Sequence, residues 1–268
     1  MECTNKIKFE GLRGVCFDLP PHELLPTGHW AFKILPVSPA WIQSNKYRLR
    51  VALGTRTDPF ASDRKSLLFI HIPKNAGTSV ARSLFGVDAN LLGHYSAQFF
   101  RRLNSKKYEQ FLKVAVVRDP IERFVSTVNY NRFTSKVSAN RSFAEKCLNF
   151  ENLSELAQAL DHDRELFKQV TNHMHFRRQV GYVCDPSGKV MVDFLLSMKS
   201  LHAGIEELGR VLGRDISLAH ANVSPPNRDG FEMSSALRDF YAPDFELWDR
   251  VSQSESGFVW LNDSYLRE

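Results

Sequence analysis

The stretch "FIHIPKNAGTSV", residues 69–80, decides the fold, because an apolar run ends at a proline and a helical pattern begins after a glycine. A strand that turns sharply into a helix points several backbone N–H groups, and the positive end of the helix dipole, at one spot. Gly77 permits close backbone approach, whereas Thr78 and Ser79 add hydroxyl donors. Lys74 adds a mobile positive charge. Together these residues predict a cradle for a phosphate or a similar oxyanion.

This stretch is not a Walker A loop, which places its lysine directly after the second glycine and a serine or threonine next. Here Lys74 stands three positions before Gly77. An ordinary turn between a strand and a helix explains so short a motif equally well. A second indication is therefore needed.

A second junction of strand and helix, "VVRDPIERFVS" at residues 116–126, provides that indication. Asp119, Pro120 and Glu122 have the spacing of an N-cap, a first helical residue and a capping partner. Arg118 stands at the carboxyl end of the preceding buried strand, where α/β proteins bind their ligands.

Arg118 and Ser126 could hold a second phosphate, with the guanidinium supplying a fork of charge-assisted hydrogen bonds. The helical spacing places Ser126 and Arg123 on the face opposite the apolar side chains of this helix. The alternative is that Arg118 pairs with Asp119 or Glu122 and that Ser126 is merely solvated.

The rest of the pattern alternates strands with helices, which predicts an α/β layer structure with a mainly parallel sheet. Buried strands are expected at residues 66–72 and 113–117. Residues 181–196 have the pattern of a hairpin that turns at "DPSG". Further helices are expected at residues 79–86, 95–103, 154–160, 164–176, 200–213 and 243–251.

Residues 1–64 differ from the rest, since prolines interrupt any helical period. Within them, "KYRLRVAL" at residues 46–53 alternates like a strand. We therefore predict a short N-terminal appendage at 1–64, irregular or β-rich and of unknown function. The main domain is expected at residues 65–268.

The composition of the 268-residue chain, 43% hydrophobic and 24% charged, is that of an ordinary globular protein. A net charge of +5 suits an anionic ligand, and the lack of a long basic run argues against nucleic acid. No apolar run approaches the roughly 18 residues of a membrane span. The N-terminus lacks the order of a signal peptide, so we expect a cytoplasmic protein, although a chain that had lost a leader would read the same.

The cysteines are widely separated in the sequence, and none has the spacing of a zinc site. We interpret them as reduced structural thiols. They are Cys3, Cys16, Cys147 and Cys184.

Together, "HIPKNAGTS" at residues 71–79 and "RDPIERFVS" at residues 118–126 resemble motifs of the sulfotransferases that use 3′-phosphoadenosine 5′-phosphosulfate (PAPS). In particular, they look like those of the carbohydrate branch, which includes heparan sulfate 2-O-sulfotransferase, and the similarity runs from about residue 66 to about residue 251. The resemblance implies a three-layer, P-loop-like fold with a central sheet flanked by helices. It also implies PAPS as the donor and a hydroxyl acceptor, most readily a carbohydrate and possibly an anionic one.

The resemblance assigns site residues to both junctions. Arg118 and Ser126 would hold the 3′-phosphate, and His94 in "LGHYS" matches the family's catalytic base. The residues assigned to the 5′-phosphosulfate are Lys74, Asn75, Ala76, Gly77, Thr78 and Ser79.

Sulfuryl transfer needs a base for the acceptor proton and a cation for the charge that grows on the leaving phosphate. A neutral imidazole titrates near physiological pH, so His94 suits the first task. Lys74 suits the second, with loop amides as further donors. This scheme requires no metal, and no carboxylate cluster near the motifs offers a metal site.

Other histidines have weaker claims. His71 is expected to lie buried in or at the end of the first strand, and His220 resembles the family only by its surroundings in "AHANVSP". His173 and His175 are expected on one helix beside Arg177, Arg178 and Gln179. This cluster is either an acceptor-binding wall or a solvated helix face.

Three other functions stay open at this stage. One is transfer to an alcohol of a lipid or a secondary metabolite instead of a carbohydrate. A P-loop-type kinase is disfavoured by the missing Walker lysine. A nucleotide-binding module that has lost its chemistry would also keep both loops, and the oligomeric state is not readable from the sequence.

Overall fold

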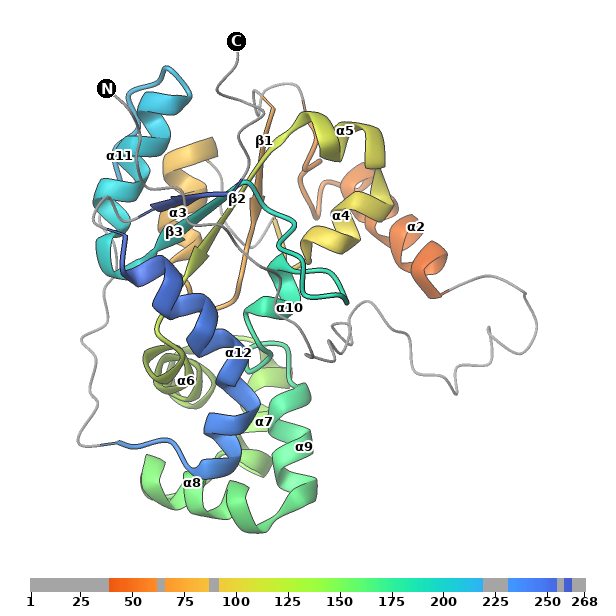
Figure 1. Cartoon of the computed structure of the whole chain (residues 1–268). Coiled ribbons are helices and arrows are strands. Elements are labelled where there is room, and N and C mark those ends of the chain that lie inside the picture. Colours follow the sequence, from red (N-terminus) through yellow and green to blue (C-terminus); the bar gives the residue numbers. More distant parts are fainter. Residues whose placement is uncertain (1–38, 62–65, 87–91, 219–230, 255–257, 262–268) are drawn as a thin grey trace.

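The chain is described here by a computed structural model. The described residues are 39–61, 66–86, 92–218, 231–254 and 258–261 (Figure 1). Its centre is a four-stranded sheet in the order β1 (Leu67–Ile70), β2 (Leu112–Val117), β3 (Phe194–Ser197) and β4 (Phe258–Trp260). The first three strands are parallel and β4 runs antiparallel to β3. The prediction of an α/β fold with a mainly parallel sheet is confirmed.

The three parallel strands are fully buried along their length. Strands covered on both faces need apolar side chains throughout, which is why their sequences are nearly continuous apolar runs. The predicted strands at 66–72 and 113–117 therefore correspond to β1 and β2. The last residues of the predicted hairpin, 194–196, lie in β3.

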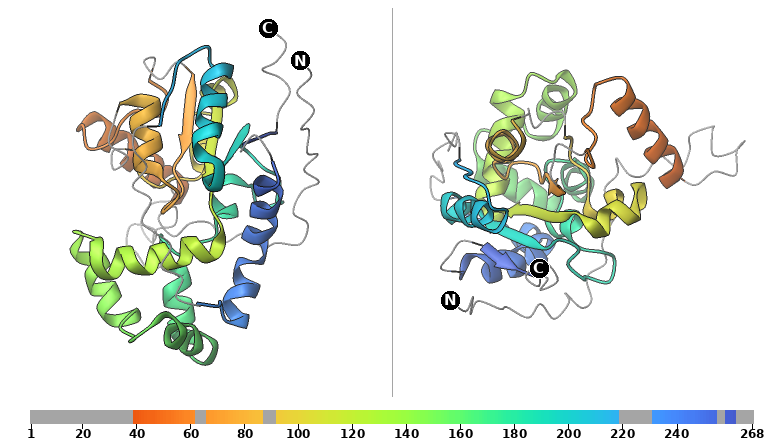
Figure 2. Two further views of the ribbon diagram at one scale, coloured as in Figure 1. Left: turned by 90° about the vertical axis from the view of Figure 1, so that its left-hand side faces the viewer. Right: turned by 90° about the horizontal axis from the view of Figure 1, so that it is seen from above.

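Helices cover both faces of the sheet and make three layers (Figures 1 and 2). One face packs against α3 (Gly77–Phe85) and α11 (Leu201–Val211). The helices that contribute to the core on the other face are α2 (Pro39–Ala52), α4 (Ala97–Leu103), α5 (Ser105–Gln110), α10 (Val180–Val183) and the end of α12 (Ser235–Ser252). The predicted helices at 79–86, 95–103 and 200–213 are α3, α4 and α11.

A third apolar core contains no strand and is built from helices and the loops that join them, at one end of the sheet (Figures 1 and 2). It begins with α6, directly after β2, and ends with the first half of α12. The predicted helix at 243–251 is the second half of α12, which also contains the residues before Pro243. The other elements around this core are α6 (Pro120–Asn129), a π-helix η3 (Tyr130–Thr134), α7 (Ser138–Cys147), α8 (Leu153–His162) and α9 (Arg164–Asn172).

The predicted strand at residues 46–53 is wrong, because this segment belongs to helix α2. Tyr47 is 2% exposed whereas Leu49 is 59% exposed, so the alternating apolar residues do not share a buried face. Tyr47 packs edge-on against Phe99, and Val51, one helical turn later, joins the same core. The prediction that residues 39–52 are irregular or β-rich is therefore wrong. Residues 1–38 lie outside the described residues, and the domain boundary at residue 64 stays a prediction.

The predicted hairpin at 181–196 is confirmed only at its turn. Asp185 accepts hydrogen bonds from the backbone N–H groups of Ser187 and Lys189, and one antiparallel bridge joins Cys184 to Val190. The first arm forms the short helix α10 instead of a strand. The buried Tyr182 lies in this helix and donates its hydroxyl proton to the carbonyl of Met174.

A buried ion pair fixes β2 against β3 at their amino ends. The Lys113 ammonium lies 2.8 Å from an Asp193 carboxylate oxygen, which also accepts the backbone N–H of Lys113. The Asp193 N–H in turn donates to the Lys113 carbonyl. Both side chains are about 95% buried, with 5% and 4% exposed. They line a cavity of about 420 Å³ together with Tyr108, which donates a hydrogen bond to the carbonyl of Met191.

Replacing one partner of this ion pair should destabilise the fold strongly. We expect Lys113→Met to lower the free energy of unfolding by about 3–5 kcal/mol, because it leaves the Asp193 carboxylate buried without its cation. Urea denaturation measures this change. The control is Arg101→Ala, which removes an exposed pair with Glu109 and should cost less than about 1 kcal/mol. Equal losses in both variants would contradict the structural role of the buried pair.

Candidate active site

The two predicted junctions lie side by side at the carboxyl edge of the sheet. Strands β1 and β2 are parallel neighbours, with Ile70 opposite Ala115, so both chains leave the sheet at the same edge. The Arg118 guanidinium donates a hydrogen bond of 3.2 Å to the Lys74 carbonyl. The loop before α3 that contains Lys74 (the lysine loop) and the turn after β2 that contains Arg118 (the arginine junction) are therefore in direct contact.

The loop before α3 has an unusual backbone. Lys74 and Ala76 have φ angles of 68° and 54°, in the left-handed region that residues with a side chain seldom adopt. Left-handed residues within a turn can direct successive backbone N–H groups into one concavity that binds anions. Such conformations carry a cost and persist where the surrounding structure imposes them, most often at functional sites.

Gly77 cannot carry a side chain in this arrangement. A Cβ atom there would lie 1.8 Å from Nε2 of His71, whose imidazole is 8% exposed beneath the loop. The prediction that His71 is buried near the end of the first strand is confirmed. The close contact lets the loop backbone lie directly on the end of β1 as helix α3 begins.

The Lys74 amine lies 4.1 Å above the centre of the Tyr130 ring. Burial, together with the positive charge of Arg118, lowers the pKa of Lys74 to about 8. The amine is therefore still mainly protonated at pH 7. It is a cation held in partly desolvated surroundings, where its charge acts more strongly than in water.

The side chain of Asn75 faces the interior. Its amide nitrogen donates to the Val116 carbonyl at 2.6 Å and to the Gln179 side-chain oxygen at 2.7 Å. The residue is 1% exposed. Any contact of Asn75 with a bound anion would therefore come from its backbone, and its side chain serves to fix the loop.

Arg118 reaches two groups at once. Besides the Lys74 carbonyl, its guanidinium lies 3.5 Å from a carboxylate oxygen of Glu122, which is one of the two pairings considered as an alternative. Asp119 caps the following helix by accepting the Glu122 N–H, as predicted. Ser126 lies two turns further along α6 and is partly exposed.

The predicted placement of Arg123 is wrong. The residue is 1% exposed and does not share the partly exposed face of Ser126. Its guanidinium donates to the carbonyls of Pro73 and His175 at 3.1 and 3.0 Å and lies 3.9 Å from Asp244. Buried charges are tolerated where such partners satisfy them, and these partners come from three distant segments.

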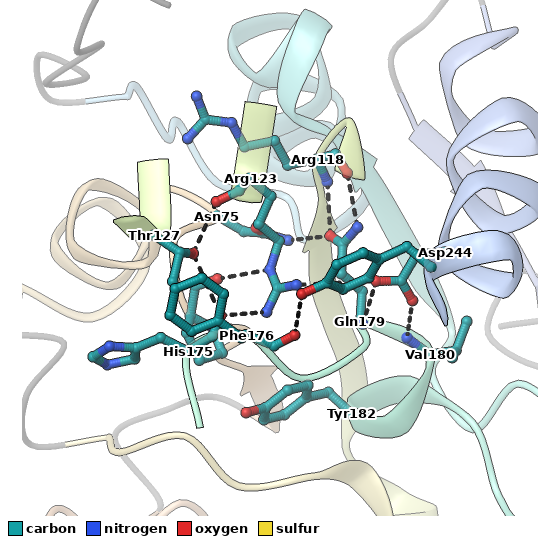
Figure 3. A network of polar contacts seen from close by, with 12 residues as sticks. Asn75, Arg118, Arg123, Thr127, His175, Phe176, Gln179, Val180, Tyr182 and Asp244 are labelled. Carbon is teal, nitrogen blue, oxygen red and sulfur yellow. Dashed lines mark hydrogen bonds and ion pairs between the residues drawn. The ribbon is translucent and has the colours of Figure 1, made fainter. Parts of the chain in front are cut away.

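A buried network joins both junctions to α10 and α12 (Figure 3). The Gln179 side-chain oxygen accepts hydrogen bonds from Asn75 and from the Arg118 N–H, and its amide nitrogen donates to the Arg118 carbonyl. Asp244 accepts the N–H groups of Gln179 and Val180 at 2.7 and 3.0 Å. Burial raises the pKa of Asp244, an effect that Arg123 and these N–H donors oppose.

His94 lies beside the lysine loop, where its Nδ1 is 3.1 Å from the His71 carbonyl. A carbonyl only accepts, so this Nδ1 carries the proton of the neutral ring and Nε2 keeps a lone pair. Burial lowers the pKa of His94 to about 4, and the positive charges of Arg56, Arg123 and Lys74 lower it further. The hydrogen bond to the His71 carbonyl has the opposite effect and raises the pKa. The ring is thus neutral at pH 7 and has the tautomer that a proton acceptor needs.

The other histidine cluster differs from its predicted arrangement. Helix α9 ends at Asn172, so His173 and His175 lie in the segment after it, where His173 stacks on Phe143 with 4.0 Å between ring centres. Burial lowers the pKa of His175 to about 2. His175 and Gln179 are buried, at 5% and 0% exposure, and so cannot belong to a surface that faces an acceptor. His220 lies outside the described residues.

The described residues also bear on the other predictions. They contain no group of three or more histidine, cysteine, aspartate or glutamate side chains that could hold a metal ion. None of their helices is long and apolar enough to span a membrane. Cys147 and Cys184 are buried free thiols, whereas Cys3 and Cys16 lie outside the described part of the chain.

Sequence reasoning missed the residues that hold the site together. Gln179, Arg123 and Asp244 act through contacts between segments far apart in the chain, for which no local pattern exists. An acidic residue directly after a proline, as in Pro243–Asp244, is a local feature that could have drawn attention to this part of the predicted helix. The residues that sequence reasoning did bring together are Lys74 and Arg118.

Comparison with known proteins gives one finding. A family model described as the sulfotransferase family matches residues 58–236, which is more than half of the chain. No curated protein and no solved structure matches the chain significantly. The matched segment contains both junctions and His94.

Loss of the Gln179 amide should loosen both junctions together. We expect Gln179→Ala to lower the free energy of unfolding by about 1–3 kcal/mol, because buried groups of Asn75 and Arg118 lose their partner. Chemical denaturation followed by circular dichroism measures this loss. Gln110→Ala, at an exposed position on α5, is the matched control and should stay within about 0.5 kcal/mol of the parent. A Gln179 variant as stable as this control would show that the network is dispensable.

Proposed function

The chain belongs to the sulfotransferase family and is a transferase of the EC 2.8.2 type, and we propose that it transfers the sulfuryl group of PAPS to a carbohydrate hydroxyl. The single observation that carries the proposal is the contact between Arg118 and the Lys74 loop. This contact supports the proposal because one doubly phosphorylated nucleotide could bind both groups only if they lay close together. The PAPS donor and the carbohydrate acceptor are supported by the likeness of the two motifs to the carbohydrate sulfotransferases.

The lysine loop fits the 5′-phosphosulfate. Its left-handed residues Lys74 and Ala76, the side-chain-free Gly77 and the start of α3 together form a cradle of backbone donors. Thr78 and Ser79 follow in the first turn of α3, where their hydroxyls can add hydrogen bonds. When bound there, PAPS supplies an activated sulfuryl group.

The arginine junction fits the 3′-phosphate. Arg118 brings a guanidinium that already bridges the two junctions, and Ser126 brings a hydroxyl from a partly exposed part of α6. A second phosphate would compete with Glu122 for the guanidinium. A dianion is the stronger partner for an arginine fork, so this competition favours the ligand.

His94 acts as the general base in this proposal. Its Nε2 accepts the proton of the attacking hydroxyl, while its Nδ1–H stays with the His71 carbonyl and fixes the ring. Lys74 offsets the negative charge that grows on the departing phosphate oxygen. The low pKa of His94 keeps the base unprotonated at neutral pH, and a bound polyanion would raise this pKa toward a more effective range.

The acceptor is the least constrained part of the proposal. The net charge of +5 tolerates an anionic sugar chain. An alcohol of a lipid or a secondary metabolite is the nearest alternative within the same chemistry. The kinase alternative is set aside, because the family match assigns the chain to sulfuryl transfer.

Transfer of label from radioactive PAPS to a panel of glycans and small alcohols tests the proposed donor and acceptor. We expect transfer to a glycan, and we expect His94→Ala to reduce it by about 10²–10⁴-fold, because the acceptor proton loses its base. The affinity for the donor, measured by calorimetry, should stay within about twofold of the parent. Undiminished transfer by His94→Ala would overturn the base assignment. Transfer only to lipid or small alcohols would overturn the carbohydrate assignment.

The role of Arg118 can be tested by nucleotide binding alone. We expect Arg118→Ala to weaken binding of adenosine 3′,5′-bisphosphate by about 10–100-fold, since a charge-assisted hydrogen bond is lost. Binding of adenosine 5′-phosphate, which lacks the 3′-phosphate, should change far less. Arg141→Ala, at an exposed site on α7, serves as the control for general charge loss. Equal weakening for both nucleotides would contradict the 3′-phosphate role.

A further inference from the structure

Helix α6 changes to a π-helix at the point where it passes the lysine loop. The π-helix η3 begins at Tyr130, whose ring lies 4.1 Å from the Lys74 amine. The same ring meets the His175 imidazole edge-on at 5.2 Å between centres. Single π-turns within helices are rare and lie frequently at functional sites.

The Tyr130 ring is fixed by its neighbours along the chain. Asn131 is fully buried, and its amide nitrogen donates to the Thr127 carbonyl. Its side-chain oxygen lies 3.3 Å from Nδ1 of His175. One residue later, the Arg132 guanidinium donates to the Phe150 carbonyl. The residues that follow Tyr130 in the π-turn are therefore held in place, and they fix the position of its ring.

The Lys74 amine is surrounded by groups that do not neutralise it. Among the described residues, no carboxylate lies within 4 Å of this amine. The face of an aromatic ring attracts a cation through its quadrupole, and the attraction grows as water is removed. The charged and titratable groups that act on or are acted on by the amine are Arg118, His94, His175 and Tyr130.

We propose that Tyr130 is a positioning residue for Lys74, with its ring face holding the ammonium in charged form above the anion cradle. The Tyr130 ring thus interacts with the ammonium where a carboxylate would otherwise pair with it. A carboxylate at this place would repel the phosphosulfate and neutralise the lysine, whereas a ring attracts the cation and carries no net charge. The expected effect on sulfuryl transfer rests on the proposed function, whereas the interaction of the ring with the Lys74 ammonium does not.

The test measures the titration of the Lys74 amine in the full chain without nucleotide. Short pulses of acetic anhydride at a series of pH values label the neutral amine, and mass spectrometry quantifies the label on Lys74. In the parent protein we expect half-maximal labelling near pH 8, since the pKa of Lys74 is about 8. In Tyr130→Leu the midpoint should fall by about 0.5–1.5 pH units, because the cation loses its ring.

Two variants serve as controls for this titration. Tyr130→Phe keeps the ring and should keep the parent midpoint. Phe133→Leu removes the exposed aromatic side chain of the same π-helix, whose ring contacts Arg132 and not Lys74, and should also leave the midpoint unchanged. An unchanged midpoint in Tyr130→Leu, or an equal shift in Phe133→Leu, would overturn the proposal.

Fluorinated phenylalanines at position 130 keep the test decisive if Tyr130→Leu does not fold. Their rings keep the shape of phenylalanine while fluorination weakens the quadrupole, so the midpoint should fall as fluorine is added. A constant midpoint across the series would refute an interaction of the ammonium with the ring face.

In the transfer assay, Tyr130→Leu should lower kcat by roughly 2–30-fold and Tyr130→Phe should not. A parent protein without PAPS activity would refute the proposed donor and leave the titration result standing.

Discussion

One buried side-chain amide, that of Gln179, holds the two turns of the site in register. Its oxygen accepts from the Asn75 side chain and from the Arg118 backbone, and its nitrogen returns a hydrogen bond to the Arg118 carbonyl. A buried polar network is stable only when its members are satisfied together, so it permits one relative position of the loops. Parallel pairing of β1 and β2 brings the turns to the same edge, and Gln179 then fixes their separation. Asp244 anchors Gln179 in turn, which ties the site to α12.

The site holds several cations close together: Arg118 and Arg123 lie near Glu122 and Asp244, whereas Lys74 forms no ion pair with a carboxylate of the described residues. Lys74 and Arg123 both act on the imidazoles of His94 and His175, whose pKa values are lowered, with burial as the largest cause for each ring. Such an arrangement opposes folding, since like charges repel and buried charges lose hydration. Functional sites are often assembled at the expense of stability. An anion that enters this site relieves the repulsion, and so binding and stabilisation of the fold are linked.

Local signals in the sequence predicted the parts of the site that depend on neighbours in the chain. The buried strands, the Asp119 cap and the contact of the Lys74 turn with Arg118 all follow from short patterns and from the rule that parallel strands end at one edge. The strand predicted at 46–53 failed because the alternation of Tyr47, Leu49 and Val51 imitates a sheet, whereas tertiary packing against α4 selects a helix. Arg123 and Gln179 could not be placed from sequence, since their partners lie 52 and 104 residues away.

Helix α2 lies before the segment that matches the family, yet it completes the core of that segment. Tyr47 caps a group of rings that includes Tyr95 and Phe99, and Arg48 donates a hydrogen bond to the Leu103 carbonyl at the end of α4. A protein shortened to begin at residue 58 would uncover these rings, the nearest of which, that of Tyr95, directly follows His94 in the chain. The uncovered aromatic surface would favour self-association, so the limits of a sequence family are a poor guide to where this polypeptide can be cut.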